Sequence, residues 1–191
     1  MAKKNKNGGG QPFSEKRYIR ERARNLEIGT CYRTTDMFKY GEGNVIVTRR
    51  HTGGKLTIGF YLVDLYCTGV KDTYYHFGME AYEFEELIEQ GDMFETCTYN
   101  EAHNLIYGSI AFAEEAGIAP HKDFALTQYI LEEDDEHIPL IEYEYGRDGK
   151  HCLITQTQLE ASRYLPLLEK NLGQGNFDFI LGDEVPDDFD S

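Results

Sequence analysis

The 191-residue chain contains no tryptophan, although it has 14 tyrosines and 11 phenylalanines. Many of its aromatic rings therefore carry a hydroxyl group that needs a hydrogen-bond partner or water once it is buried. No apolar run approaches the ~20 residues that a membrane-spanning helix needs, so we expect no such span. With 40% hydrophobic residues, the chain is long enough to form one domain with a sizeable core.

Cysteine is scarce and widely spaced, with Cys31, Cys67, Cys97 and Cys152 as its four positions. There is no CxxC pair, and no secretory signal precedes the cysteines. This pattern excludes the usual signature of a disulfide-stapled secreted domain. We therefore expect reduced thiols in a cytoplasmic protein.

Several common catalytic and cofactor motifs are missing. Neither GxGxxG nor GxxxxGK[ST] occurs, and the glycine pair Gly53-Gly54 lies between two predicted strands, where it is typical of a turn. The sequence has no GxSxG nucleophile elbow. It also has no HxxxH or HExxH pair that would indicate zinc. These absences favour a non-enzymatic protein, and no cofactor is predicted from the motifs.

Positive charge is scarce except near the N-terminus. The formal net charge is −15, but residues 1–24 carry eight basic and two acidic side chains, a net charge of +6. The remaining residues carry 11 basic and 32 acidic side chains, a net charge of −21. Such a body would be repelled by nucleic acid, so any phosphate contact would have to come from the N-terminal segment.

The basic segment has a pattern suited to phosphate contacts. Ser14 can cap a short helix that contains KRYIRERAR, in which Tyr18 is interleaved with the cations. A flexible lysine-bearing arm precedes this helix, and contacts from such cations would weaken steeply with salt. The predicted nucleic-acid-binding residues are Lys3, Lys4, Lys6, Lys16, Arg17, Arg20 and Arg24. Alternatively, Arg20, Arg22 and Arg24 pair with the acidic surface of the same protein.

The periodicity predicts an α+β fold with a largely antiparallel sheet of two hairpins plus edge strands, and three to four helices packed on it. The first hairpin spans 44–64 around Gly53-Gly54, with His51 opposite Leu56, Val47 opposite Phe60, and Asp64 on that same face. A third strand covers 70–77, and the second hairpin covers 140–155. Helices are predicted at 80–90, at 98–117 with a Thr98–Glu101 capping box, at 122–131, and from 158 with an interruption at Pro166. A last edge strand is predicted at 176–181.

The predicted organisation is a disordered basic tail (1–12), a basic helical arm (13–29), a single α+β domain (30–182) and an acidic tail (183–191). The leading hypothesis is a small cytoplasmic binding or adaptor protein. Its arm contacts RNA or a ribonucleoprotein, and its acidic body contacts other proteins, a basic protein being one possible partner. A purely protein-binding structural module is another alternative, and no membrane contact is predicted.

The enzymatic alternative is a metal-dependent hydrolase, either a nuclease or a nucleotide phosphodiesterase. Asp64 follows the apolar face of a central strand, where an unpaired carboxylate would be costly. Asp64 and Asp72 could bind Mg²⁺ or Mn²⁺ while Lys71 stabilises phosphodiester charge and His51 acts as an accessory acid or base. The ordinary interpretation of Asp64 is a capped turn or a salt bridge with Lys71, Arg49 or Arg50.

Overall fold

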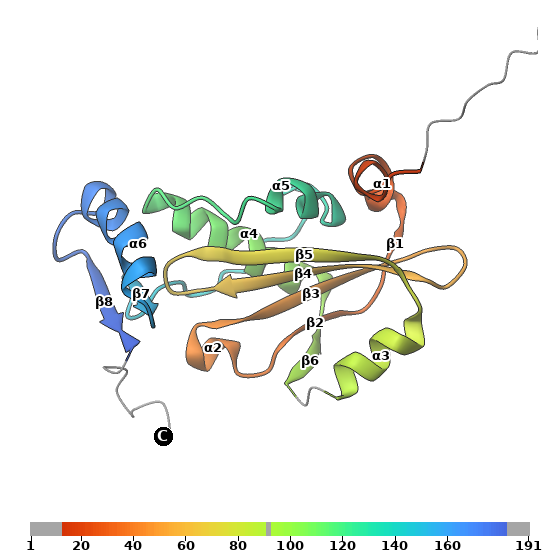
Figure 1. Ribbon diagram of the computed structural model, residues 1–191, viewed down its shortest axis with the longest axis horizontal. Helices are drawn as coiled ribbons and strands as arrows, with labels where there is room; N and C mark the ends of the chain where they lie inside the picture. Colours follow the sequence, from red (N-terminus) through yellow and green to blue (C-terminus); the bar gives the residue numbers. More distant parts are fainter. Residues whose placement is uncertain (1–12, 91–92, 183–191) are drawn as a thin grey trace, which may run out of the picture.

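The computed structural model describes residues 13–90 and 93–182. Its centre is an antiparallel sheet in the order β5-β4-β3-β2-β6, with the short β1 pairing to the far end of β3 (Figure 1). The α+β fold with a largely antiparallel sheet is thus confirmed. The six strands are β1 (Glu27–Ile28), β2 (Cys31–Thr34), β3 (Glu42–Arg50), β4 (Leu56–Asp64), β5 (Gly69–Met79) and β6 (Phe94–Cys97).

The first hairpin is present, but its predicted register is wrong by one residue. Val47 lies opposite Gly59 and Ile46 lies opposite Phe60. The connection is longer than a Gly53-Gly54 turn, because the His51 amide donates to the Lys55 carbonyl at 2.8 Å and closes a wider loop. A one-residue slip moves side chains to the opposite face of a strand. The slip accordingly places Val47 on one face of the sheet and Phe60 with Asp64 on the other.

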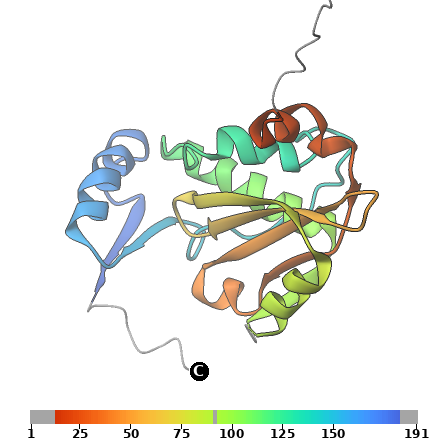
Figure 2. The same cartoon turned by 45° about the vertical axis from the view of Figure 1, so that its right-hand side comes forward.

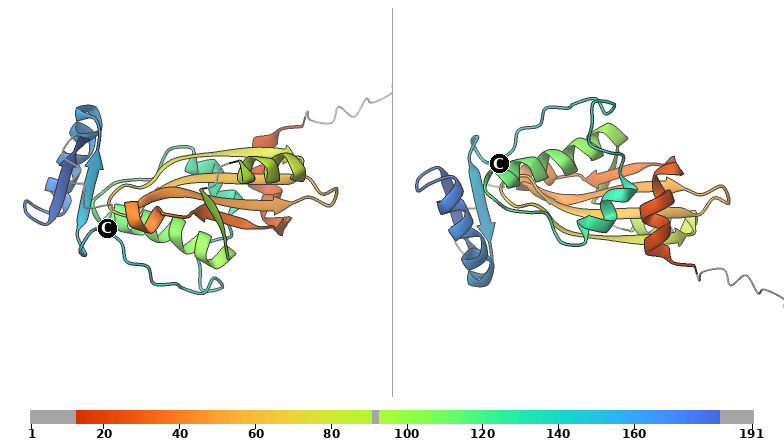
Figure 3. Two further views of the ribbon diagram at one scale, coloured as in Figure 1. Left: turned by 90° about the horizontal axis from the view of Figure 1, so that it is seen from below. Right: turned by 90° about the horizontal axis from the view of Figure 1, so that it is seen from above.

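Helix α4 (Tyr99–Glu115) covers one face of the sheet and forms the main core with it. Both bonds of the predicted Thr98–Glu101 capping box are present. Its buried residues Leu105 and Ile106 pack with Val45, Val47 and Tyr61. The elements α1 (Glu15–Arg22), η1 (Ala23–Asn25), α5 (Phe124–Thr127) and η2 (Gln128–Ile130) lie on the same side (Figure 3). The predicted helix at 122–131 is therefore split into two shorter turns.

The opposite face carries a smaller core beneath α3 (Ala81–Glu89), which confirms the helix predicted at 80–90. Phe84 is buried against Ile46, Ile58 and Phe60. Away from α3, this face is open at the β5 edge, where Tyr74 stacks on Phe60 but remains 52% exposed. A short helix, α2 (Met37–Tyr40), precedes β3.

The predicted second hairpin at 140–155 is wrong. Residues 140–150 contain no strand and run beside α4, where the Ile141 amide donates to the Asn104 carboxamide at 2.9 Å. Strand β7 (His151–Thr155) instead pairs in parallel with β8 (Phe177–Leu181). Helix α6 (Gln158–Asn171) connects them and continues through Pro166. The second hairpin of the sheet is β4–β5, so the chain still has two hairpins.

The β7–α6–β8 unit stands beside the end of the main sheet (Figure 2). It joins the sheet at the β4–β5 turn, where the Cys152 amide donates to the Tyr66 carbonyl at 2.9 Å. Cys67, Leu153 and Leu168 are buried in a small cluster at this junction, together with the last turns of α4. The junction places Asp64 and Lys71 next to residues of α6. Among the described residues, no helix is long and apolar enough to cross a membrane.

Candidate functional site

Helix α1 is fixed to the body by its apolar side. The Ser14 hydroxyl caps it by accepting the Arg17 amide at 3.4 Å, and a hydroxyl at this position satisfies a free amide of the first turn. Ile19 and Ala23, four residues apart, are both fully buried in the main core. The predicted arm is therefore anchored from residue 15 onward, and the rest of the helix surface faces solvent.

The cations of this helix fall into two groups. Lys16, Arg20 and Arg22 are exposed, and no ion pair joins them to any residue in 13–90 or 93–182. Arg17 is also exposed but pairs within the helix with Glu21 at 2.9 Å. The predicted contact residues Lys3, Lys4 and Lys6 lie outside the described residues.

Arg24 differs from the other predicted contact residues because it lies against the body. Its Nε donates to the Leu131 carbonyl at 2.7 Å, and its guanidinium pairs with Glu133 at 2.6 Å. The same group lies 5.3 Å from the centre of the Tyr129 ring. The alternative of pairing with the protein's own acidic surface thus describes Arg24, whereas Arg20 and Arg22 remain exposed.

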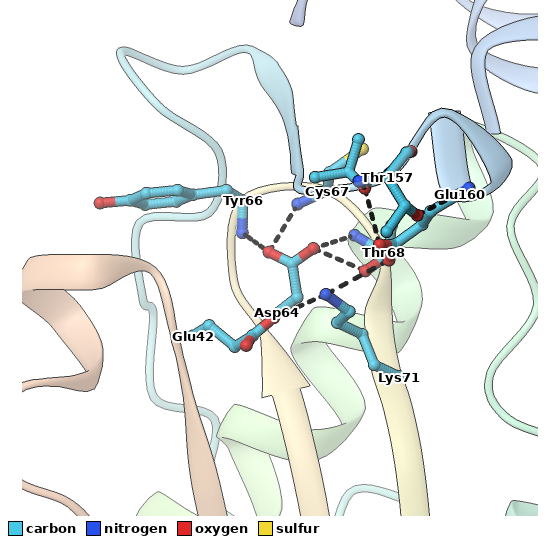
Figure 4. A network of polar contacts seen from close by, with 9 residues as sticks. Glu42, Asp64, Tyr66, Cys67, Thr68, Lys71, Thr157 and Glu160 are labelled. Atoms are coloured by element: carbon cyan, nitrogen blue, oxygen red, sulfur yellow. Dashed lines mark hydrogen bonds and ion pairs between the residues drawn. The ribbon is translucent and has the colours of Figure 1, made fainter. Parts of the chain in front are cut away.

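Asp64 ends β4 and holds the turn that follows. Its carboxylate accepts the amides of Tyr66, Cys67 and Thr68 at 2.8, 3.2 and 2.9 Å, and the Thr68 hydroxyl at 2.6 Å (Figure 4). Burial raises the pKa of Asp64, while the Thr68 and Tyr66 donors and the Lys71 charge oppose that rise. Of the arrangements predicted for Asp64, the structure therefore contains the capped turn.

Lys71 ties three elements together near this turn. Its ammonium group lies 2.8 Å from the Glu42 carboxylate and 3.4 Å from the Glu160 carboxylate, so β5 is linked to β3 and α6 (Figure 4). These residues border a cleft of about 620 Å³ that also involves Tyr66 and Thr157. Both carboxylates engage Lys71, but the lining of the cleft holds three carboxyl groups for this one ammonium group and keeps an excess of acidic side chains.

The structure does not gather the four residues of the hydrolase hypothesis. Asp72 lies near His121, with 3.5 Å between its carboxylate and the imidazole Nδ1. His51 is at the opposite end of β4, where its Nε2 lies 2.8 Å from the Thr57 hydroxyl. Within residues 13–90 and 93–182, no three His, Cys, Asp or Glu side chains are arranged to hold a metal ion.

Arg49 is a buried structural residue that sequence reasoning missed. It is 1% exposed, and its guanidinium donates to the Ile130 carbonyl at 2.7 Å and the Leu26 carbonyl at 3.1 Å. It also pairs with Glu132 at 2.8 Å. The sequence does place Arg49 two residues after Val47 on a strand with two apolar faces. That position indicates that its side chain is buried. Its partners are up to 83 residues away, so the strand pattern could not identify them.

Comparison with protein-family models, with curated proteins and with solved structures found no match.

Proposed function

We propose that this protein binds RNA through α1 and the basic segment that precedes it. The observation that carries the proposal is that α1 and η1 bury Ile19 and Ala23 while Lys16, Arg20 and Arg22 remain exposed. Lys16 and Arg20, four residues apart, share one side of the helix, and Arg22 lies on the other side, so a phosphate backbone that crosses α1 can contact all three without a rearrangement of the body. Because the helix is preformed, little conformational entropy is lost when it binds.

The negative charge of the body limits the side from which RNA can approach. Residues outside 1–24 carry a net charge of −21, which repels a polyanion from most of the surface. RNA would therefore approach on the α1 side and leave the remaining surface available to other partners. This distribution supports an adaptor function, in which the acidic body contacts a protein while the helix holds RNA.

The metal-dependent hydrolase stays a prediction that no observation favours. The Asp64 oxygens accept four hydrogen bonds from the turn, and Lys71 is held by Glu42 and Glu160. Asp72 and His51 lie with other partners. We therefore place the proposed contact on α1.

The test is a charge reversal of the three exposed cations of α1 that form no ion pair within the described residues. The triple variant Lys16→Glu, Arg20→Glu and Arg22→Glu retains both buried anchors, whereas deletion of residues 1–24 would remove them and disturb the fold. A control with the same charge change reverses Lys122, Lys150 and Lys170, which are exposed elsewhere. The probe is a labelled RNA hairpin with a single-stranded extension, followed by fluorescence anisotropy over a range of salt concentrations.

We expect the α1 variant to bind at least tenfold more weakly and the control to retain most of its affinity. The slope of log affinity against log salt should flatten by about 2, since each lost contact to a single strand contributes about 0.7. Absence of binding by the unmodified protein would refute the proposal. An equal loss of affinity in both variants would also refute it, because the contact would then be a general charge effect.

A further inference from the structure

A group of aromatic rings lies on the side of α1 that carries Arg22, the side opposite to Lys16 and Arg20. Tyr18 stacks with His51 at a centroid distance of 5.8 Å and meets the edge of Phe77 at 5.1 Å. Phe13 lies 5.5 Å from Phe77 and 6.2 Å from Tyr18. We call Phe13, Tyr18, His51 and Phe77 the aromatic platform. They come from three parts of the chain that meet where α1 crosses the end of the sheet (Figure 3).

The platform is open to solvent on one side. Phe13 is 68% exposed, the largest exposure of any phenylalanine in the described chain, and Tyr18 and Phe77 are only partly buried. Exposing so much apolar ring surface is unfavourable in water. A ring needed only to attach α1 to the sheet would be more deeply buried, as Ile19 and Ala23 are.

Cations flank the platform. Arg22 follows Tyr18 by four residues, so the two lie on the same side of α1. Arg50 is exposed at the end of β3 and lines a pocket together with His51. Carboxylates lie nearby as well: Glu15 and Glu21 are each three residues from Tyr18 on α1, and Glu27 lies opposite Arg50 in the β1–β3 pair. Rings bordered by arginines offer stacking surfaces for bases and charges for the phosphates that join them.

We infer that the RNA contacted by α1 is single-stranded and that its bases stack on the aromatic platform, with Phe13 as the outermost ring. This inference rests on the proposed function and adds the form of the ligand. In a duplex the flat faces of the bases are stacked on each other and are not available to Phe13 or Tyr18. Stacking on an aromatic ring tolerates any base, so binding with little sequence preference is expected.

The absence of tryptophan from the natural sequence provides a direct test. The variant Phe13→Trp introduces a single indole at the exposed edge of the platform, and its emission reports on base stacking. The protein is titrated with single-stranded oligouridine RNA and with an abasic strand of the same length and charge. We expect oligouridine to quench the indole emission and to bind roughly tenfold more tightly than the abasic strand.

A second variant, Phe13→Ala, removes the outermost ring. It should weaken oligouridine binding roughly tenfold and leave abasic-strand binding unchanged. Phe179→Ala is the matched control, because Phe179 is 39% exposed on β8, in the unit beside the opposite end of the sheet; it should change neither affinity. Circular dichroism should show the same folded spectrum for both variants.

The possible results distinguish base stacking on the platform from the proposed phosphate contact on α1. If both strands bind equally, the indole emission is unchanged and Phe13→Ala has no effect, the stacking inference is wrong while the phosphate contact on α1 stands. If duplex RNA of equal length binds more tightly than the single strand, the inference is also wrong. If none of the three nucleic acids binds, the proposed function fails together with it.

Discussion

The two ends of the β3–β4 hairpin each bury a charged side chain and satisfy it in different ways. At the β4–β5 turn, all four donors to the Asp64 carboxylate lie within the next four residues of the chain. At the other end, the Arg49 guanidinium reaches partners 23 to 83 residues away. Asp64 thus organises one turn, whereas Arg49 joins β3 to η1 and to the chain that follows η2.

This difference has consequences for the surface above each end. The Asp64 end borders a cleft in which two carboxylates share the ammonium group of Lys71. The Arg49 end supports η1, from which Arg24 extends to Glu133, and α1 with its exposed cations. Buried ion pairs cost desolvation and do not stabilise a fold by themselves. We infer that Arg49 serves to fix the position of the helix proposed to contact RNA.

The largest effect is expected from Arg49→Met, a substitution of similar length without charge. It would leave the carbonyls of Ile130 and Leu26 without their donor and remove the partner of Glu132. Each hydrogen bond from a charged donor contributes about 1.5–3 kcal/mol, so the loss of these two donors should cost about 3–6 kcal/mol. Urea denaturation should show this loss in the free energy of unfolding. Glu132→Gln is the control and should cost less, because the Arg49 guanidinium keeps the Ile130 and Leu26 carbonyls as acceptors and the introduced carboxamide oxygen can still accept from it.

If Arg49→Met destabilises the protein no more than Glu132→Gln does, the bonds from Arg49 to distant carbonyls do not hold the fold together. The contrast with the local bonds of Asp64 is then wrong. A second readout is the rate of amide hydrogen exchange in and just after η1. Amide hydrogen exchange in Ala23 and Leu26 should accelerate in Arg49→Met more than exchange in β4, because η1 loses its attachment first.

An intermediate effect is expected from Asp64→Ala, which leaves three buried amides and the Thr68 hydroxyl without their acceptor. Unsatisfied buried donors and the loss of hydrogen bonds to a charged group together cost about 2–4 kcal/mol. Thr68→Val removes only the 2.6 Å hydroxyl bond and should cost about 1–2 kcal/mol. Thermal unfolding measures both. If Thr68→Val costs as much as Asp64→Ala, the three amide bonds to Asp64 contribute nothing to stability, and the role assigned to Asp64 in holding this turn is wrong.

The smallest effect concerns pH at the Arg49 end. His103 on α4 is 1% exposed and lies beneath the acidic loop, with its Nδ1 3.9 Å from the Asp134 carboxylate. Burial lowers the pKa of His103 below its ordinary value of 6.5, although Asp134 and the Glu132 backbone oppose the shift. The unfolded chain therefore binds this proton first, and stability falls as the pH drops below about 6.5.

His103→Gln removes that titrating group. Its free energy of unfolding, measured in urea between pH 7.5 and pH 5.5, should fall less steeply with decreasing pH than that of the unmodified protein. Burial also lowers the pKa of His51, so part of the slope should remain. Identical slopes in the two proteins would show that His103 is not buried in its neutral form.

The sequence could predict the features whose bonds close over a few residues. The α4 helix begins at Thr98 because the Thr98 hydroxyl and the Glu101 carboxylate cap each other's amides three residues apart. Ser14 caps α1 in the same local way. The concentration of cations near the N-terminus, on which the candidate site depends, is likewise a property of the sequence alone.

The sequence could not predict which cations face solvent. Arg20 and Arg24 look equivalent in KRYIRERAR, and their different environments follow from the acceptors that η2 and the acidic loop place beside η1. The sequence could not predict the aromatic platform either. Phe13, His51 and Phe77 are far apart in the chain and meet only through the β4–β5 pairing and the position of α1.

The sequence by itself determined the class of fold, the capped helices and the separation of charge, since propensities and caps act between near neighbours. Only the tertiary structure decided the hairpin register, the parallel β7–β8 pair, the burial of Arg49 and the choice of exposed cations. Each of these depends on atoms brought together from distant parts of the chain, and a pattern of residue types does not specify such distances.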